Sequence, residues 1–258
     1  MEKYVEYIRQ VEIASLWQGR KHIVWHLDPK VNVLSGANGM GKSTILRRVA
    51  SGVKMIDGSM KKAETDLKQD VETAGQGTVQ TAVRGAEMEG IIISTYPEDA
   101  TLLRYDVITT PDVRSEFDTN LNGLQQRIVH YPHNERWELF CDIVDEMFAP
   151  TEKTIARDAN EVEMIQWGER LDLKYLSSGE KQMLTILMTV LLEDGDHTVL
   201  LMDEPEVSLH LEWQQVLITT IQRLNPNVQI ILSTHSPAII MNGWMDKVTE
   251  VSDITVVE

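Results

Sequence analysis

The sequence of 258 residues contains a single cysteine, Cys141. One cysteine cannot form an intrachain disulfide, and there is no cluster of cysteine and histidine at the spacing of a zinc site. Both absences fit a reducing compartment. We therefore expect the protein to be cytoplasmic.

Long apolar runs are also missing. No stretch approaches the roughly 18 consecutive apolar residues that suggest a membrane-spanning helix. The first 17 residues mix charges into their apolar positions, so they lack the hydrophobic centre of a signal peptide. We expect a soluble or peripheral protein without membrane insertion.

Basic residues are scarce relative to acidic ones, with 24 Lys and Arg against 40 Asp and Glu and a formal net charge of −16. This balance disfavours strong non-specific binding to nucleic acid or to anionic membranes. A local basic cluster interrupts the acidity, and this leaves DNA binding open. Its members are Arg47, Arg48, Lys54, Lys61 and Lys62.

Apolar residues make up 42% of the chain, which is enough for one sizeable core. Continuous apolar runs at 31–35, 91–94, 198–203 and 228–233 predict buried strands, and alternation at 11–17 and 22–28 predicts half-buried ones. A helical pattern between the last two runs predicts a strand–helix–strand unit with parallel strands. Its apolar positions are Leu209, Trp213, Val216, Leu217, Ile221 and Leu224.

Two further amphipathic patterns predict helices that would form an inserted helical lobe. We place this lobe at about 106–179 and an α/β core at about 1–105 and 180–258, within one domain. Residues 53–90 are polar and predict exposed loops or hairpins. The two patterns consist of Val113, Phe117, Leu121, Leu124 and Ile128, and of Trp137, Phe140, Val144 and Met147.

The segment GANGMGKST, residues 36–44, follows a predicted strand and precedes a predicted helix at 45–50. It satisfies the P-loop pattern, in which glycines let backbone N–H groups surround phosphates, the lysine reaches the β and γ phosphates, and the serine joins Mg²⁺. A simple glycine turn is the alternative. The expected nucleotide-binding residues are Asn38, Gly39, Met40, Gly41, Lys42, Ser43 and Thr44, with Ser43 also a magnesium ligand.

Two buried strands end in polar residues. Asp203 and Glu204 end the strand at 198–203, and His235 follows the strand at 228–233. Ligands bind at the carboxyl ends of parallel strands, so we expect Asp203 to hold Mg²⁺ and Glu204 to orient or deprotonate water. We expect His235 to donate a hydrogen bond to the γ-phosphate. The alternatives are helix-capping carboxylates and an ordinary loop histidine.

A second small-residue turn, YLSSGEKQ at 175–182, also leads into a predicted helix. Ser177 offers a hydroxyl and Gly179 permits close approach of the backbone, and both suit a γ-phosphate at the helix N-terminus. Without further context the same residues are equally typical of a helix cap. We expect Ser177, Ser178, Gly179 and Glu180 to contact nucleotide.

Together, GANGMGKST, LSSGEKQ, LLMDEPEVSLH and STHSP resemble Walker A, the signature motif, Walker B with its D-loop, and the switch histidine of ABC-superfamily ATPase heads. The resemblance implies an α/β P-loop NTPase fold of the ABC-ATPase type, with a parallel-sheet core, an antiparallel β region and the helical lobe. It also implies a homodimer induced by ATP. Each MgATP then lies between Walker A of one subunit and the signature of the other.

Several departures from the motifs of transporter subunits indicate which branch of the ABC superfamily the sequence resembles. Ser178 and Glu180 replace the usual Gly and Gln, and the D-loop ends in SLH at His210. These features are more similar to RecF-like, SMC-like and OLD-like ATPases of DNA repair and phage defence, although Leu211 stands where many of them have Pro. The TOPRIM domain of OLD-like nucleases and the coiled-coil heptads of SMC-like proteins are not found. The Q-loop glutamine expected after 91–94 is not found either.

The predicted function is therefore that of an ATPase head that hydrolyses ATP and drives a separate protein effector. One alternative is the nucleotide-binding subunit of a membrane transporter. The other is an ATP-dependent interaction platform in which hydrolysis is incidental.

Overall fold

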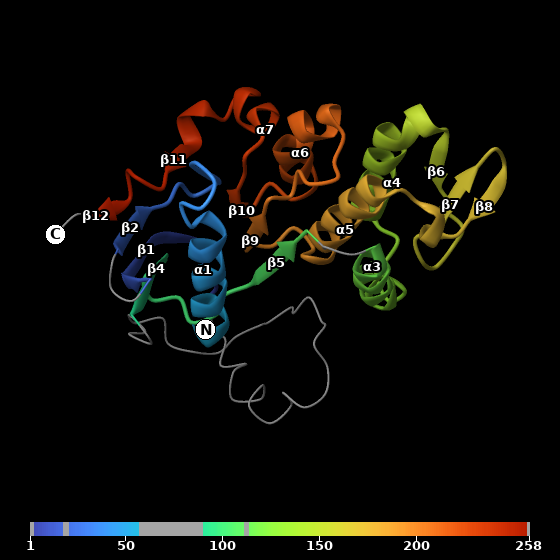
Figure 1. Ribbon diagram of the computed structural model, residues 1–258. Coiled ribbons are helices and arrows are strands. Elements are labelled where there is room, and N and C mark those ends of the chain that lie inside the picture. Colours follow the sequence, from blue (N-terminus) through green and yellow to red (C-terminus); the bar gives the residue numbers. More distant parts are fainter. Residues whose placement is uncertain (1–2, 18–20, 57–89, 111–113, 257–258) are drawn as a thin grey trace. The chain divides into compact units, whose positions relative to one another are not determined.

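The computed structural model in Figure 1 describes residues 3–17, 21–56, 90–110 and 114–256. The chain divides into two compact units. The first consists of Met1–Thr109, His197–Pro205 and Asn227–Glu258, and the second of Thr110–Asp196 and Glu206–Pro226.

A parallel five-stranded sheet forms the centre of the first unit, in the order β11-β3-β10-β9-β5. Its inner strands β3 (Val31–Ser35), β9 (Thr198–Asp203) and β10 (Val228–Ser233) are buried along almost their whole length. All three were predicted with these bounds, because residues covered on both faces of a sheet form continuous apolar runs. The flanking strands β5 (Tyr105–Thr109) and β11 (Val248–Glu250) were not predicted.

The first unit also contains a four-stranded antiparallel sheet in the order β12-β2-β1-β4. The predicted half-buried strands are present as β1 (Tyr7–Leu16) and β2 (Lys21–His26), and β12 (Thr255–Val256) pairs with β2. Strand β4 (Ile91–Tyr96) corrects one expectation. It pairs antiparallel with β1 and buries alternate residues, Ile91 and Ile93, so it is a half-buried strand.

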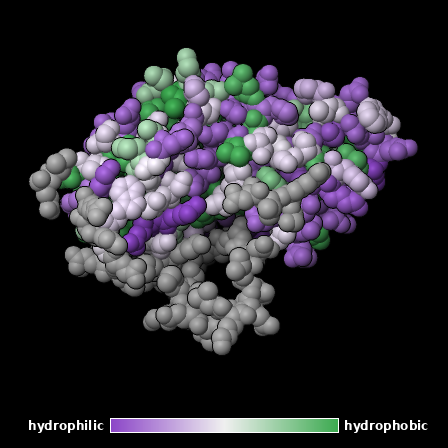
Figure 2. Space-filling model, viewed as in Figure 1, coloured by the Kyte–Doolittle hydropathy of each residue, from purple (hydrophilic) through white to green (hydrophobic). Residues whose placement is uncertain are grey.

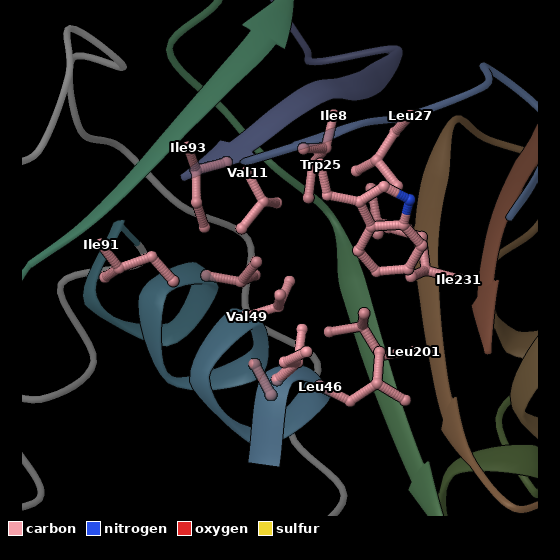
Figure 3. Close-up of a cluster of buried hydrophobic side chains, with 14 of the residues drawn as sticks. Ile8, Val11, Trp25, Leu27, Leu46, Val49, Ile91, Ile93, Leu201 and Ile231 are labelled. Atoms are coloured by element: carbon pink, nitrogen blue, oxygen red, sulfur yellow. The ribbon is translucent and has the colours of Figure 1, made fainter. Parts of the chain in front are cut away.

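Helix α1 (Lys42–Ile56) packs into a core that both sheets of this unit share. In Figure 3 its Leu46 and Val49 point into a cluster that includes side chains of the parallel and the antiparallel sheet. The Gln229 side chain also joins the sheets, because its Oε1 accepts from Ile8 N–H at 2.7 Å and its Nε2 donates to Ile8 O at 2.8 Å. These contacts hold the amino end of β10 next to β1.

The second unit contains α3 (Arg114–Ile128), α4 (Glu135–Phe148), α5 (Ser178–Leu192) and α6 (Leu211–Leu224). The two predicted amphipathic helices are α3 and α4, with their predicted apolar residues buried apart from Val113, which lies outside the described residues. A small antiparallel sheet of β6 (Lys153–Ile155), β7 (Met164–Gln166) and β8 (Glu169–Leu171) was not predicted.

The division of the chain differs from the predicted domain boundaries at three places. Residues 106–109, expected in the lobe, belong to the first unit as part of β5. Residues 180–196 and 206–226, expected in the core, belong to the second unit. Helix α5 buries residues on all sides and packs against α3 and α4, which explains its nearly uniform apolar sequence. Helix α6 buries Leu217, Ile218, Ile221 and Leu224, whereas Val216, predicted on this face, is exposed.

Short elements complete the described chain: η1 (Ala149–Thr151), η2 (Leu173–Tyr175), α7 (Pro237–Met241) and η3 (Met245–Lys247). Most of the polar segment 53–90, predicted as loops or hairpins, lies outside the described residues. Hydrophilic residues predominate on the face drawn in Figure 2. Among the described residues, none of the helices has the length and apolar character needed to cross a membrane.

Candidate functional site

The loop between β3 and α1 has the geometry of a phosphate cradle. Gly39 and Gly41 have φ values of +79° and +95°, a left-handed backbone that glycine adopts without strain. Helix α1 begins directly after them at Lys42, and no acidic residue lies in its first turn. The positive end of the helix and the loop N–H groups can therefore attract an anion with no carboxylate in the first turn of the helix to oppose them.

Lys42 lies folded against this loop. Its Nζ donates a hydrogen bond to the carbonyl oxygen of Gly36 at 2.9 Å, and the residue is only 4% exposed. A lysine held here is satisfied by a backbone carbonyl and remains next to the loop. It can exchange that partner for phosphate oxygens with a change of side-chain rotamer alone.

Trp17, at the end of β1, is a residue of this site that the sequence reasoning missed. Its ring lies against Gly41 so closely that a Cβ at position 41 would be 2.2 Å from two ring carbons. The backbone angle favours glycine at position 41, and a larger residue would also have to displace the indole. In the sequence, Trp17 shows only as a tryptophan at the end of a predicted strand. That position does not indicate that its ring contacts the P-loop.

These residues surround a cavity of about 740 Å³. That volume falls within the roughly 300–1,000 Å³ of typical small-molecule sites. Every predicted Walker A residue lines it except Met40, whose side chain packs against the apolar core. The complete lining is Trp17, Asn38, Gly39, Gly41, Lys42, Ser43, Thr44, Glu204 and His235, all from the first unit.

The ends of β9 and β10 join through Ser233. Its Oγ donates a 2.6 Å hydrogen bond to Oδ1 of Asp203, and its carbonyl oxygen accepts from Glu204 N–H at 3.1 Å. Glu204 has φ +47°, which is uncommon for a residue other than glycine and costs conformational energy. The turn after β9 is thus held in a strained form that directs Glu204 into the cavity.

Glu204 and His235 meet at the cavity wall. Oε1 of Glu204 lies 3.5 Å from Nε2 of His235, and both side chains are a little over one-third exposed. The sequence predicted both residues at the carboxyl edge of the sheet, and the parallel register of Ser233 with Asp203 brings them to that common edge. A carboxylate and an imidazole next to a phosphate cradle can bind and activate water.

The residues expected to hold Mg²⁺ fit that ion chemically. Ser43 offers a hydroxyl in the first turn of α1, and Asp203 offers a carboxylate at the end of β9. Hard oxygen ligands of this kind suit Mg²⁺, which commonly retains several waters and binds substrate phosphates. Ser43 lines the cavity, whereas Asp203 is not a lining residue and accepts a hydrogen bond from Ser233.

The signature turn belongs to the second unit, where Ser177 caps helix α5. Ser177 Oγ accepts from Glu180 N–H at 3.2 Å, and Glu180 Oε2 accepts from Ser177 N–H at 2.8 Å. This capping box leaves the N–H groups of Ser178 and Gly179 without an intrahelical acceptor. Ser177 is exposed, while Glu180 is buried, so only the serine side chain faces outward.

Gly179 has a second reason to be glycine. A Cβ at this position would lie 2.4 Å from the carbonyl oxygen of Ser208, in the turn before α6. Ser208 itself has φ +83°. Gly179 therefore lets the signature turn lie close to the D-loop of the same chain, and its approach to a nucleotide stays a prediction.

The strand that precedes the second unit is β5 and not the run at 91–94, where a Q-loop glutamine was sought. Strand β5 ends at Thr109, whose register partner on β9 is Asp203. Residues 111–113, which follow β5, lie outside the described residues.

The chain is similar to several known proteins. The family described as "AAA domain, putative AbiEii toxin, Type IV TA system" matches residues 163–242, which include Ser177, Glu204 and His235. The retron Vc95 probable ATPase of Vibrio cholerae serotype O1 biovar El Tor is 21% identical over 63% of this chain and 36% of that protein. The Septu protein PtuA of Bacillus thuringiensis is 24% identical over 81% of this chain and 67% of that protein.

Among solved structures, the SMC head domain from Thermotoga maritima covers 94% of both chains with a TM-score of 0.54 and 15% identity. At that identity the likeness shows the fold alone. The chain thus has the α/β fold of a P-loop ATPase head of the ABC and SMC type, as predicted. The predicted resemblance to ATPase heads of the SMC-like branch is confirmed by these matches.

Proposed function

We propose that this chain is an ATPase head that hydrolyses ATP, forms a head-to-tail homodimer around two MgATP, and gates a separate protein effector in anti-phage defence. The observation that carries the proposal is the cavity in which the P-loop, Glu204 and His235 face one space. A phosphate cradle alone would support nucleotide binding. The adjoining carboxylate and imidazole add the groups needed for hydrolysis.

The proposal assigns chemical roles to the P-loop, the two acids at the end of β9 and His235. Lys42 exchanges the Gly36 carbonyl for oxygens of the β and γ phosphates, and the glycine loop binds the phosphates through its N–H groups. Glu204 orients a water and accepts its proton as the water oxygen bonds to the γ-phosphorus and ADP leaves. His235 donates to the γ-phosphate. Ser43 and Asp203 would hold Mg²⁺, which would supply charge that offsets the negative phosphates.

The signature turn supports the proposed head-to-tail dimer. Ser177 is exposed, and its Oγ uses a lone pair in the helix cap, which leaves its hydroxyl hydrogen for another acceptor. The N–H groups of Ser178 and Gly179 point the same way, as first-turn donors of α5. In the ABC superfamily, which this chain resembles, such a turn meets the γ-phosphate bound by a partner subunit.

The biological setting rests on the relatives. The branch indicated by the SLH ending of the D-loop includes ATPases of phage defence, and two relatives are named for a retron and for Septu. The chain spans about one-third of the first relative's length and about two-thirds of the second. The effector is accordingly part of the proposal, and DNA binding through the cluster that begins at Arg47 and Arg48 is an additional hypothesis.

The Glu204→Gln variant tests the proposal. Loss of the general base is expected to slow ATP turnover about 10²- to 10⁴-fold while ATP still binds. ATP-bound dimers should then accumulate. Mass photometry of the variant with and without MgATP measures this directly, with phosphate release recorded in parallel.

The matched control combines Glu204→Gln with Lys42→Ala, which removes a charged phosphate contact and should stay monomeric at the same MgATP concentration. A Glu204→Gln variant that binds ATP at stoichiometric levels and remains monomeric would overturn the dimer. Unchanged turnover in Glu204→Gln would overturn the role of Glu204.

A further inference from the structure

The carboxylate of Glu180 joins the signature turn to the small sheet of the second unit. Its Oε1 lies 2.7 Å from Nζ of Lys153 on β6 and 3.1 Å from Oγ1 of Thr151. Its Oε2 accepts the N–H of Ser177 at 2.8 Å. One carboxylate therefore connects β6 and the end of η1 to the cap of α5.

This ion pair is buried. The side chains of Lys153 and Glu180 are 11% and 4% exposed. Burial by itself raises the pKa of Glu180, but the Lys153 ammonium and the Ser177 N–H together bring that pKa below its ordinary value. The acid is thus charged in the folded protein, and Lys153 is the cation that compensates it.

Helix capping alone does not require a charge at position 180. A glutamine, usual at the matching position in transporter subunits, can accept the Ser177 N–H through its amide oxygen. A carboxylate buried without a cation would destabilise the turn, so Glu180 depends on Lys153 in a way that glutamine would not. The ion pair therefore explains both why residue 180 departs from the transporter pattern and why a lysine is buried at position 153.

The segment that carries Lys153 is itself fixed by the β7–β8 hairpin. Gln166 Nε2 donates to Thr151 O at 2.9 Å, and the Trp167 indole N–H donates to Glu152 Oε2 at 2.7 Å. Glu152, next to Lys153, has φ +55°. These hydrogen bonds fix the backbone next to Lys153. The position of its ammonium group is therefore well defined, as a residue that positions another side chain requires.

A second buried lysine, Lys181, also contacts the chain around the signature turn. The Lys181 side chain is fully buried, forms an ion pair with Asp118, and donates to the carbonyl oxygen of Lys174 at 2.9 Å. Lys174 lies in the 3-10 turn that precedes Ser177. The chain before the cap and the helix after it are therefore both anchored to buried cations.

We propose that Lys153 is a positioning residue for the nucleotide contact of Ser177: through Glu180 it holds the Ser177 hydroxyl and the free N–H groups of the signature turn in the orientation that meets the partner's γ-phosphate. The inference rests on the proposed function, because it assigns Lys153 to the trans contact of the ATP-bound dimer. Lys153 itself touches no nucleotide. The small β6–β7–β8 sheet thereby becomes part of the dimer machinery.

The test uses Glu204→Gln as the parent, because it accumulates ATP-bound dimers. Lys153→Met in this parent removes the cation and retains the apolar stem. The dimer dissociation constant in MgATP is expected to rise about 10- to 100-fold, the equivalent of one hydrogen bond to a charged group. The affinity of the monomer for ATP, set by Walker A of the same chain, should change by less than about twofold, since the cavity residues are untouched.

A double variant separates positioning from general damage. Lys153→Met with Glu180→Gln leaves no unpaired charge and retains an acceptor for the Ser177 N–H, so it should recover most of the lost dimerisation. Glu180→Gln alone leaves the Lys153 ammonium without its carboxylate and should also weaken the dimer. This variant tests the role of the Lys153–Glu180 ion pair if Lys153→Met does not fold.

The matched control is Arg157→Met, which removes the ion pairs of Arg157 with Glu138, Asp142 and Asp145 in the same unit. It should dimerise like the parent. A folded Lys153→Met variant that dimerises like the parent, or a double variant no better than either single one, would overturn the inference alone. Failure of the parent itself to dimerise would instead overturn the proposed function.

Discussion

Ser233 on β10 holds Asp203 on β9 through a hydrogen bond of 2.6 Å from its Oγ to Oδ1 of the acid. The same serine accepts the N–H of Glu204. A single fully buried side chain thus positions the expected magnesium ligand and the turn that carries the expected base.

We expect Ser233→Ala to lower the free energy of unfolding by about 1.5–3 kcal/mol, the cost of losing a hydrogen bond to a charged group. Urea denaturation measures the loss, and ATP turnover should fall with it because Asp203 is no longer held. The control is Ser51→Ala on α1, where an exposed serine bonds only to the backbone of its own helix. Equal stability of both variants would contradict the role of Ser233.

Trp17 is expected to cover the base of the bound nucleotide, because its ring lies at the P-loop mouth and lines the cavity. Trp17→Ala should weaken ATP binding by about 1–3 kcal/mol, the range found for stacking of a base on an aromatic ring. Trp17→Phe should retain part of that affinity. Calorimetric titration with ATP measures both.

The control for Trp17 is Trp167→Ala, which removes a tryptophan that is 78% exposed in the other unit. ATP affinity should stay unchanged in this variant. If Trp17→Ala also binds ATP like the unaltered protein, the ring has no part in nucleotide binding.

Gly179→Ala should destabilise the protein by about 1–3 kcal/mol, as expected when a methyl group is forced into a filled space. The added Cβ would meet the Ser208 carbonyl, which belongs to a backbone and cannot turn aside as a flexible side chain can. Gly123→Ala on α3 is the matched control, because nothing lies within 4 Å of its added Cβ. Since alanine favours helix over glycine, this control should gain up to about 1 kcal/mol. Urea unfolding of the two variants should therefore give shifts of opposite sign.

Cys141 should resist alkylation in the folded protein. Burial raises the pKa of its thiol to about 12, so almost no thiolate exists near neutral pH. Iodoacetamide at about pH 8 should modify it only after unfolding, when the pKa returns to about 8.5. Mass spectrometry with and without urea measures the extent of modification. Rapid modification of the native chain would contradict the burial of the Cys141 side chain on α4.

The same raised pKa implies a decrease of stability at high pH. Above its ordinary pKa the unfolded thiol releases its proton, whereas the folded thiol keeps it until about pH 12. The unfolded state then binds fewer protons, and the contribution of Cys141 to the free energy of unfolding falls as the pH rises. Cys141→Ala should lack this part of the pH dependence.

Much of this protein is determined by the sequence itself. Strands β3, β9 and β10 were predictable to the residue, because strands covered on both faces leave uninterrupted apolar runs. The P-loop and the acids after β9 were predictable because phosphate binding and water activation require particular residue types at strand ends. The sequence also predicted that Ser177 could cap a helix, as the alternative to a nucleotide contact.

Only the tertiary structure decides which distant residues meet. The neighbours Trp17 and Gly41, Lys153 and Glu180, and Gly179 and Ser208 each come from separate segments, and no local periodicity encodes such pairs. Short strands such as β5 to β8 were missed for a related reason. Three to five residues are too few for a hydrophobic period to show, so these strands are stabilised by their partners and not by a pattern of their own.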